Sequence, residues 1–326
     1  TDYYGVRISL FLFQTLVTIG QIIFAFGISS ANYQLMLLGR FIYALGNSSE
    51  SIAEFTIVTK WFTGKELALS LALANSMFGV GAFFNSIVTP RIRDATQDLS
   101  SPAIFGSYLC LISQLFLFGL LWMDFENERR EKKFNMAPLV NQEVKIKISD
   151  AKNFKKIYWY LAFYYAFTGT AFFTFTNIAN DFIHVRFGYS NVGAGNIVSW
   201  IYIVTALITP IGGYIVDKTQ KYVTIMILAA LCGFIGYVLF LVIPSCNECL
   251  IIFFPLTLIG LLLAMSDAAV EPALSMVVDA SHLGTGFGIF YVLQNILLSI
   301  TPLIIGGISD SIEDSEGGYF GATLFL

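Results

Sequence analysis

Four acidic residues form two pairs inside long apolar stretches of the sequence. Glu50 and Glu54 are four residues apart, and so are Asp267 and Glu271. On a helix this spacing puts both carboxylates of a pair on one face, about 5–6 Å apart. A charge near the centre of a membrane helix costs about 2.5–3.5 kcal/mol, so we expect these acids to face protein or a water-filled cavity. Each pair could then hold an exchangeable proton, whereas Glu54 and Glu271 could instead approach the cytoplasmic headgroups and pair with loop Lys or Arg.

The segments that carry these acids are typical of membrane-spanning helices. The chain is 56% hydrophobic and 12% charged, whereas ordinary soluble domains are roughly 25% charged. A bilayer core needs about 20 helical residues, and the sequence contains nine apolar segments of that size, with a tenth opening at Gly318. The nine are predicted at about 7–28, 33–59, 66–90, 102–124, 156–180, 191–215, 222–244, 250–278 and 285–308.

Basic residues in the loops orient the predicted spans. Loops on the side of residues 1–7 carry most of the Lys and Arg, many of them in the polar segment 125–155. Short cytoplasmic loops carry such an excess, so this side is predicted to be cytoplasmic. The segment 125–155 would then be a cytoplasmic linker between an N-terminal bundle, residues 1–124, and a C-terminal bundle, residues 156–326.

Two similar polar junctions indicate an internal repeat. Residues 2–7 and 213–221 each stand beside long apolar stretches, and an acid pair follows Asp2 and Asp217 at nearly the same distance. Parallel repeats of this kind are a known design of membrane transporters.

Several motifs along nearly the whole chain resemble the major facilitator superfamily. They are the run GRFIYALG at 39–46, the run WFTGKEL at 61–67, and the run LGTGFG at 283–288 with Gln294 and Asn295. The resemblance is closest to the lysosomal dipeptide-transporter branch. It implies an all-α membrane protein of two six-helix bundles, in which the nine spans are helices three to eleven. Helices one, two and most of twelve would then lie outside the sequence.

The resemblance also implies a function. It indicates a secondary active or facilitative transporter that moves a small polar solute, a dipeptide or amino acid, by alternating access. The expected location is a lysosomal or vacuolar membrane, or otherwise another endomembrane, with a single-span glycosylated accessory subunit as a partner. The chain has Ser48, Gly79 and Glu271 where the branch places an acid, an Arg and a Trp. The more acidic cavity favours a cationic or proton-linked solute. The alternative is a non-transporting receptor or scaffold, because function lives in sites rather than folds.

Further residues are candidates for the transport site and for its gates. Arg40 lies inside a span, where it could contact substrate or join two helices. Tyr164 and Tyr165 are cavity candidates, because a buried phenol needs a hydrogen-bond partner. A junction Asp can accept hydrogen bonds from a neighbouring helix N-terminus and hold the cytoplasmic side shut, whereas the alternative is a plain polar turn. The gating candidates are Asp2, Arg7, Asp217, Lys218 and Lys221.

Few other residues could carry chemistry. Cys246 and Cys249 lie in a short loop on the side away from the cytoplasm, where they could form a disulfide in an oxidising lumen or remain thiols in a reducing one. We expect no metal site, because no further ligands lie near them. The sequence has no phosphate loop, nucleophile elbow or DNA-binding basic patch. We therefore expect no enzyme activity, no cofactor and no nucleic-acid partner.

Overall fold

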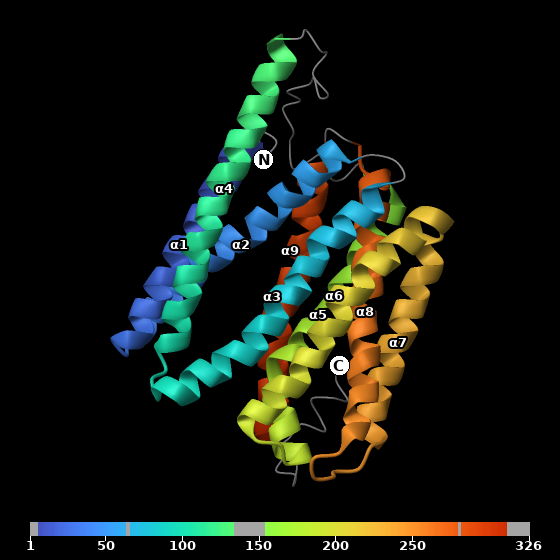
Figure 1. Ribbon diagram of the computed structural model, residues 1–326. Helices are drawn as coiled ribbons and strands as arrows, with labels where there is room; N and C mark the ends of the chain where they lie inside the picture. The colour runs from blue at the N-terminus through green and yellow to red at the C-terminus, as the bar shows by residue number, and fades with distance from the viewer. Residues whose placement is uncertain (1–5, 63–65, 134–153, 280–281, 312–326) are drawn as a thin grey trace. The chain divides into compact units, whose positions relative to one another are not determined.

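The computed structural model describes residues 6–62, 66–133, 154–279 and 282–311, which form α-helices and one short 3-10 helix (Figure 1). The elements in chain order are α1 (Val6–Ser29), α2 (Tyr33–Trp61), α3 (Leu67–Thr96), α4 (Ser101–Lys133), α5 (Lys156–Phe187), α6 (Asn191–Thr219), α7 (Tyr222–Val242), η3 (Leu250–Ile252), α8 (Phe253–Val277) and α9 (Leu283–Ser311).

Each of the nine predicted spans corresponds to one helix of the described chain, which confirms the all-α fold class. Within that part of the chain, seven helices are long and apolar enough to cross a membrane. The two that fall short are α2, which carries Arg40 and two acids, and α5, which is rich in Tyr and Thr. The predicted tenth span, from Gly318, lies outside the described residues.

The chain forms two compact units. Unit 1 comprises residues 1–61, 92–152 and 279–288, and unit 2 comprises residues 62–91, 153–278 and 289–326. In unit 1, α1 packs along α2 and against α4. In unit 2, α8 packs against α5, α6 and α7 (Figure 1). The division into bundles of residues 1–124 and 156–326 stays a prediction.

Two adjacent glycines on α6 allow two other helices to approach closely. A Cβ atom at Gly213 would lie 2.5 Å from the Ala72 Cβ of α3, and one at Gly212 would lie 2.9 Å from the Ala268 Cβ of α8. Side chains do not tolerate contacts this short, so only glycine fits at these positions. The helix α6 therefore lies in close contact with both α3 and α8.

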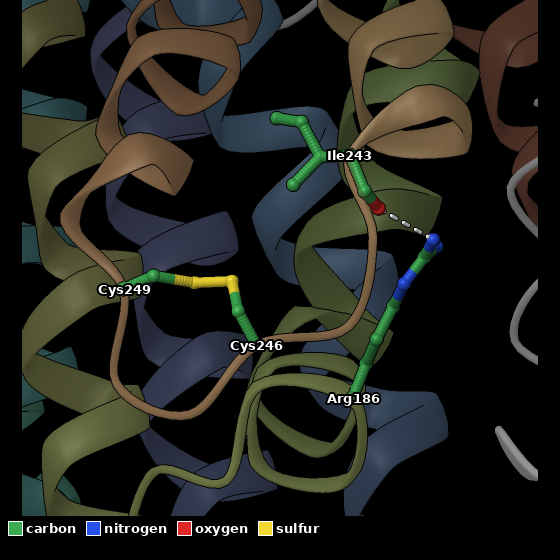
Figure 2. The surroundings of a disulfide bond; sticks show 4 residues. All are labelled: Arg186, Ile243, Cys246 and Cys249. Atoms are coloured by element: carbon green, nitrogen blue, oxygen red, sulfur yellow. Dashed lines mark hydrogen bonds between the residues drawn. A yellow bond between two sulfur atoms is a disulfide. The ribbon is translucent and has the colours of Figure 1, made fainter.

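A short disulfide-closed loop leads into α8. Cys246 and Cys249 are joined by a disulfide, as one of the two predicted alternatives has it (Figure 2). Arg186, which is buried near the end of α5, donates a hydrogen bond from Nη2 to the Ile243 carbonyl at 2.9 Å. The Glu248 amide donates to the carbonyl of Phe187 at 2.9 Å. These contacts tie the loop to α5 and fix where α8 begins.

We predict that Gly213→Ala destabilises the protein by about 1–3 kcal/mol, because the added methyl would overlap with Ala72. The midpoint of thermal unfolding of the purified full-length protein in detergent should fall by several degrees. The matched control is Gly306→Ala, since no atom lies within 4 Å of where its Cβ would be. The control should keep or raise the midpoint, because alanine favours a helix over glycine by about 1 kcal/mol. Equal midpoints for the two variants would contradict the close contact between α3 and α6.

Candidate functional site

The acids Asp267 and Glu271 lie one turn apart on α8, and both are buried, with exposed fractions of 6% and 0%. Both oxygens of Glu271 accept hydrogen bonds. Asn75 Nδ2, from α3, donates to Oε2 at 2.5 Å, and the Tyr291 hydroxyl, from α9, donates to Oε1 at 2.8 Å. One carboxylate therefore joins three helices of unit 2.

Asp267 has a different environment. The Tyr165 phenol, from α5, lies close to the Asp267 carboxyl group, whereas Asp267 Oδ1 is buried without a hydrogen-bond partner among the described residues. The Tyr165 ring stacks on Phe290 with ring centroids 4.6 Å apart. A buried carboxylate oxygen without a donor is unfavourable until it takes up a proton or meets a cationic group. Asp267 is therefore the acid of this site that is best placed to accept either one.

We call Asn75, Tyr165, Asp267, Glu271 and Tyr291 the α8 acid cluster. The sequence predicted three of its members, the two acids and Tyr165, and the structure brings them together. Asn75 and Tyr291 were not predicted. A polar Asn within the apolar start of α3 was the available signal for the first, while Tyr291 is one of many aromatics and gave none.

Tyr164 lies next to Tyr165 in sequence but makes different contacts. Its hydroxyl donates to the Met226 carbonyl of α7 at 2.8 Å and lies 3.0 Å from the Ser266 hydroxyl of α8. The phenol thus has the polar partners that burial requires, and it joins α5 to α7 and α8. Its role in binding solute stays a prediction.

The acids of α2 belong to unit 1 and lie in a different setting. With the Gln14 amide oriented to suit its neighbours, its nitrogen donates to both Glu50 oxygens at 2.6 and 2.9 Å, and its oxygen accepts from the Ser113 hydroxyl at 3.3 Å. Gln14 is buried on α1 and was not predicted. Glu54, four residues further along α2, is exposed. Glu50 is thus the α2 acid with a defined polar partner.

Arg40 on α2 lies over aromatic rings. Its guanidinium carbon is 3.8 Å from the centroid of the Phe24 ring on α1 and 5.9 Å from that of Tyr43. Such cation–π contacts are worth about 0.5–2 kcal/mol. In the described part of the chain no carboxylate pairs with Arg40. The contact with Phe24 agrees with the expectation that Arg40 joins two helices. A contact of Arg40 with substrate stays a prediction.

Asp217 at the end of α6 lies at the N-terminus of α3. Its Oδ1 accepts a hydrogen bond from the Ala68 amide at 3.2 Å, and its Oδ2 accepts one from the Leu69 amide at 2.8 Å. Amides in the first turn of a helix have no partner within that helix, and the helix dipole favours a negative charge there. This is the contact expected of a junction Asp.

The structure describes three of the other four gating candidates. The Arg7 guanidinium forms an ion pair with Asp124 of α4 and donates to the Asp124 carbonyl at 3.0 Å. Lys218 is exposed in the last turn of α6, and Lys221 is exposed just before α7. Asp2 lies outside the described residues. Control of the cytoplasmic side by these residues stays a prediction.

The apolar helices and the acids buried among them define a multi-pass α-helical membrane protein. Comparison with known sequences then places the chain more narrowly. It belongs to the Major Facilitator Superfamily, because the model of that family matches residues 1–311.

Individual relatives agree with this assignment. The chain is 30% identical over 313 residues to the lysosomal dipeptide transporter MFSD1 of Danio rerio, which covers 94% of this chain and 67% of that protein. It is 29% identical over 317 residues to MFSD1 of Homo sapiens, with 94% and 66% covered. The chain thus spans about two thirds of the length of these relatives. The crystal structure of the human organic anion transporter MFSD10 (TETRAN) has the same fold, with a TM-score of 0.72, 14% identity and 99% and 76% of the two chains covered.

The cap on α3 leads to a prediction about Asp217. Asp217→Ala should weaken the first turn of α3 by about 0.5–2 kcal/mol, because it removes both acceptors. The amides of Ala68 and Leu69 should then exchange with deuterium faster than in the wild type, as measured by mass spectrometry on the full-length protein. Asp181→Asn, at an exposed position on α5, is the control and should leave this exchange unchanged. Wild-type exchange in Asp217→Ala would mean that the cap contributes nothing.

Proposed function

We propose that the protein is a transporter that moves a small polar solute, a dipeptide or an amino acid, across the lysosomal membrane by alternating access. The observation that carries this proposal is the α8 acid cluster, with two acids buried inside an apolar helix of unit 2. Similarity to the lysosomal dipeptide transporters MFSD1 of Danio rerio and Homo sapiens supports the solute class and the membrane. A single-span accessory subunit remains part of the proposal.

The chemistry of the cluster favours a solute with a positive charge. Carboxylates and phenol hydroxyls suit an ammonium group, such as the amino terminus of a dipeptide or a Lys side chain. Asp267 Oδ1, which has no donor among the described residues, is the natural acceptor for such a group. The same oxygen could accept a proton, so the alternative for this site is that transport of the solute is coupled to a proton gradient.

A non-transporting receptor or scaffold is less well supported. Each acid inside a membrane helix costs about 2.5–3.5 kcal/mol on insertion scales. A scaffold would gain nothing from that cost, because the apolar surfaces of α6 and α8 already pack closely. The buried acids therefore favour transport.

We predict that Asp267→Asn reduces uptake about tenfold or more, since losing one partner of a buried charge pair costs about 2–5 kcal/mol. The assay is uptake of lysyl-alanine, alanyl-alanine and glutamyl-alanine by the full-length protein in proteoliposomes, with and without an imposed pH gradient. Wild-type uptake should be greatest for lysyl-alanine and least for glutamyl-alanine. Glu50→Gln, assayed alongside, tests the acid of unit 1 separately.

The control is Glu126→Gln, because within the described residues the ion pair of Glu126 is the one with Arg130, one turn away at the surface of α4. It should transport at the wild-type rate, since exposed ion pairs of this kind contribute little. Wild-type uptake of every dipeptide by Asp267→Asn, at every pH gradient tested, would refute the role given to the α8 acid cluster.

A further inference from the structure

Asn75 lies on the face of α3 that packs against α6. The residues Ala68, Ala72, Asn75 and Gly79 are spaced by four, three and four positions, so they line one face of the helix. On this face Ala72 meets Gly213, and a Cβ at Gly79 would lie 2.9 Å from the Ala206 amide nitrogen. Asn75 is the polar member of an otherwise small, apolar stripe.

Two polar contacts therefore attach α3 to its neighbours in unit 2. The first is the Asp217 cap on the amides of Ala68 and Leu69. The second is the hydrogen bond from Asn75 to Glu271, about 10 Å further along the helix at about 1.5 Å per residue. The first contact involves an acid in the last turn of α6, whereas the second involves the α8 acid cluster.

We propose that Asn75 is a positioning residue that makes the packing of α3 depend on whether the α8 acid cluster is occupied. This inference rests on the proposed function and deepens it. While the cluster is empty, the charged Glu271 carboxylate holds Asn75 and so keeps α3 against α6 and α8. When a cationic group binds beside Asp267, one turn away on the same helix, it draws on the same negative charge and the hydrogen bond to Asn75 weakens.

Electrostatics gives the reason for this dependence. A hydrogen bond to a carboxylate is roughly twice as strong as one between neutral groups, because the acceptor is ionised. A cation bound near Glu271 partly neutralises that negative charge. The hydrogen bond from Asn75 to the Glu271 carboxylate therefore becomes weaker. The Asp217 cap alone cannot keep the whole of α3 packed against its neighbours, because its hydrogen bonds go to amides of the first turn of α3.

The dependence matters for alternating access. In the predicted bundles, α3 belongs to residues 1–124, whereas α6 and α8 belong to residues 156–326. Alternating access moves one bundle against the other around the solute, so contacts between α3 and α8 must break during each cycle. A contact that weakens when solute binds would link binding to that movement.

Amide hydrogen exchange on the full-length protein tests the proposal. Without solute, Asn75→Ala should raise the exchange rate of the Ala68 and Leu69 amides about tenfold, as expected when a hydrogen bond to a charged group is lost. Adding lysyl-alanine to the wild type should raise exchange in the same segment. In Asn75→Ala the dipeptide should cause no further increase.

The matched control is Asn85→Ala, on the same helix, where the Asn85 side chain accepts a hydrogen bond from Thr89 one turn away and from no other of the described residues. It should exchange and respond to the dipeptide as the wild type does. If Asn75→Ala does not reach the membrane, Glu271→Gln weakens the same bond and should raise the same exchange. The double variant with both Asn75→Ala and Glu271→Gln should raise the exchange rate of the Ala68 and Leu69 amides little more than either change alone, because both changes remove one interaction.

Wild-type exchange in both Asn75→Ala and Glu271→Gln without solute would overturn the proposal. So would an unchanged response of Asn75→Ala to lysyl-alanine. A wild-type protein that takes up lysyl-alanine but shows no change in exchange on binding it would also overturn it, while leaving the transport function intact. Absence of uptake by the wild type would instead count against the function, and the measurement without solute would still decide whether Asn75 holds α3.

Discussion

The constraint on which the structure depends is the cost of placing a carboxylate inside an apolar membrane helix. Asp267 and Glu271 can remain on α8 only if other helices bring donors to them. Tyr291 from α9 and Asn75 from α3 donate hydrogen bonds to Glu271, and the Tyr165 phenol from α5 lies close to Asp267. The packing of unit 2 therefore follows from satisfying two acids as much as from burying apolar surface.

Close packing makes this satisfaction possible. Short side chains such as that of Asn75 reach a neighbouring helix only where the backbones lie close together. Gly212 and Gly213 allow that approach, the first toward α8 and the second toward α3. The Asp217 cap then fixes the start of α3, so that Asn75 lies at the level of Glu271. The glycines, the Asp217 cap and the Asn75 amide thus act together on three helices, α3, α6 and α8.

The sequence predicted the helices well and the site in part. Apolar runs of about 20 residues identify spans without any tertiary information, and acids within them are conspicuous. Helix ends were less well predicted, since α5 continues through Arg186 to Phe187, whereas the apolar pattern stops near residue 180. This last part of α5 mixes polar residues with apolar ones, and its Phe182, Ile183 and Phe187 side chains are fully buried in the core of unit 2. Asn75 and Gln14 were missed because a neutral amide shows its role only when the structure reveals which carboxylate it meets.

Infrared difference spectroscopy of the full-length protein in a membrane can show whether the α8 acids engage the transported solute. Adding lysyl-alanine at constant pH should change the carboxyl bands. Asp267→Asn should abolish this change, and Asn85→Ala should preserve it. If the carboxyl bands of the wild type stay the same at saturating dipeptide, under conditions in which the protein transports it, the α8 acids do not engage the solute.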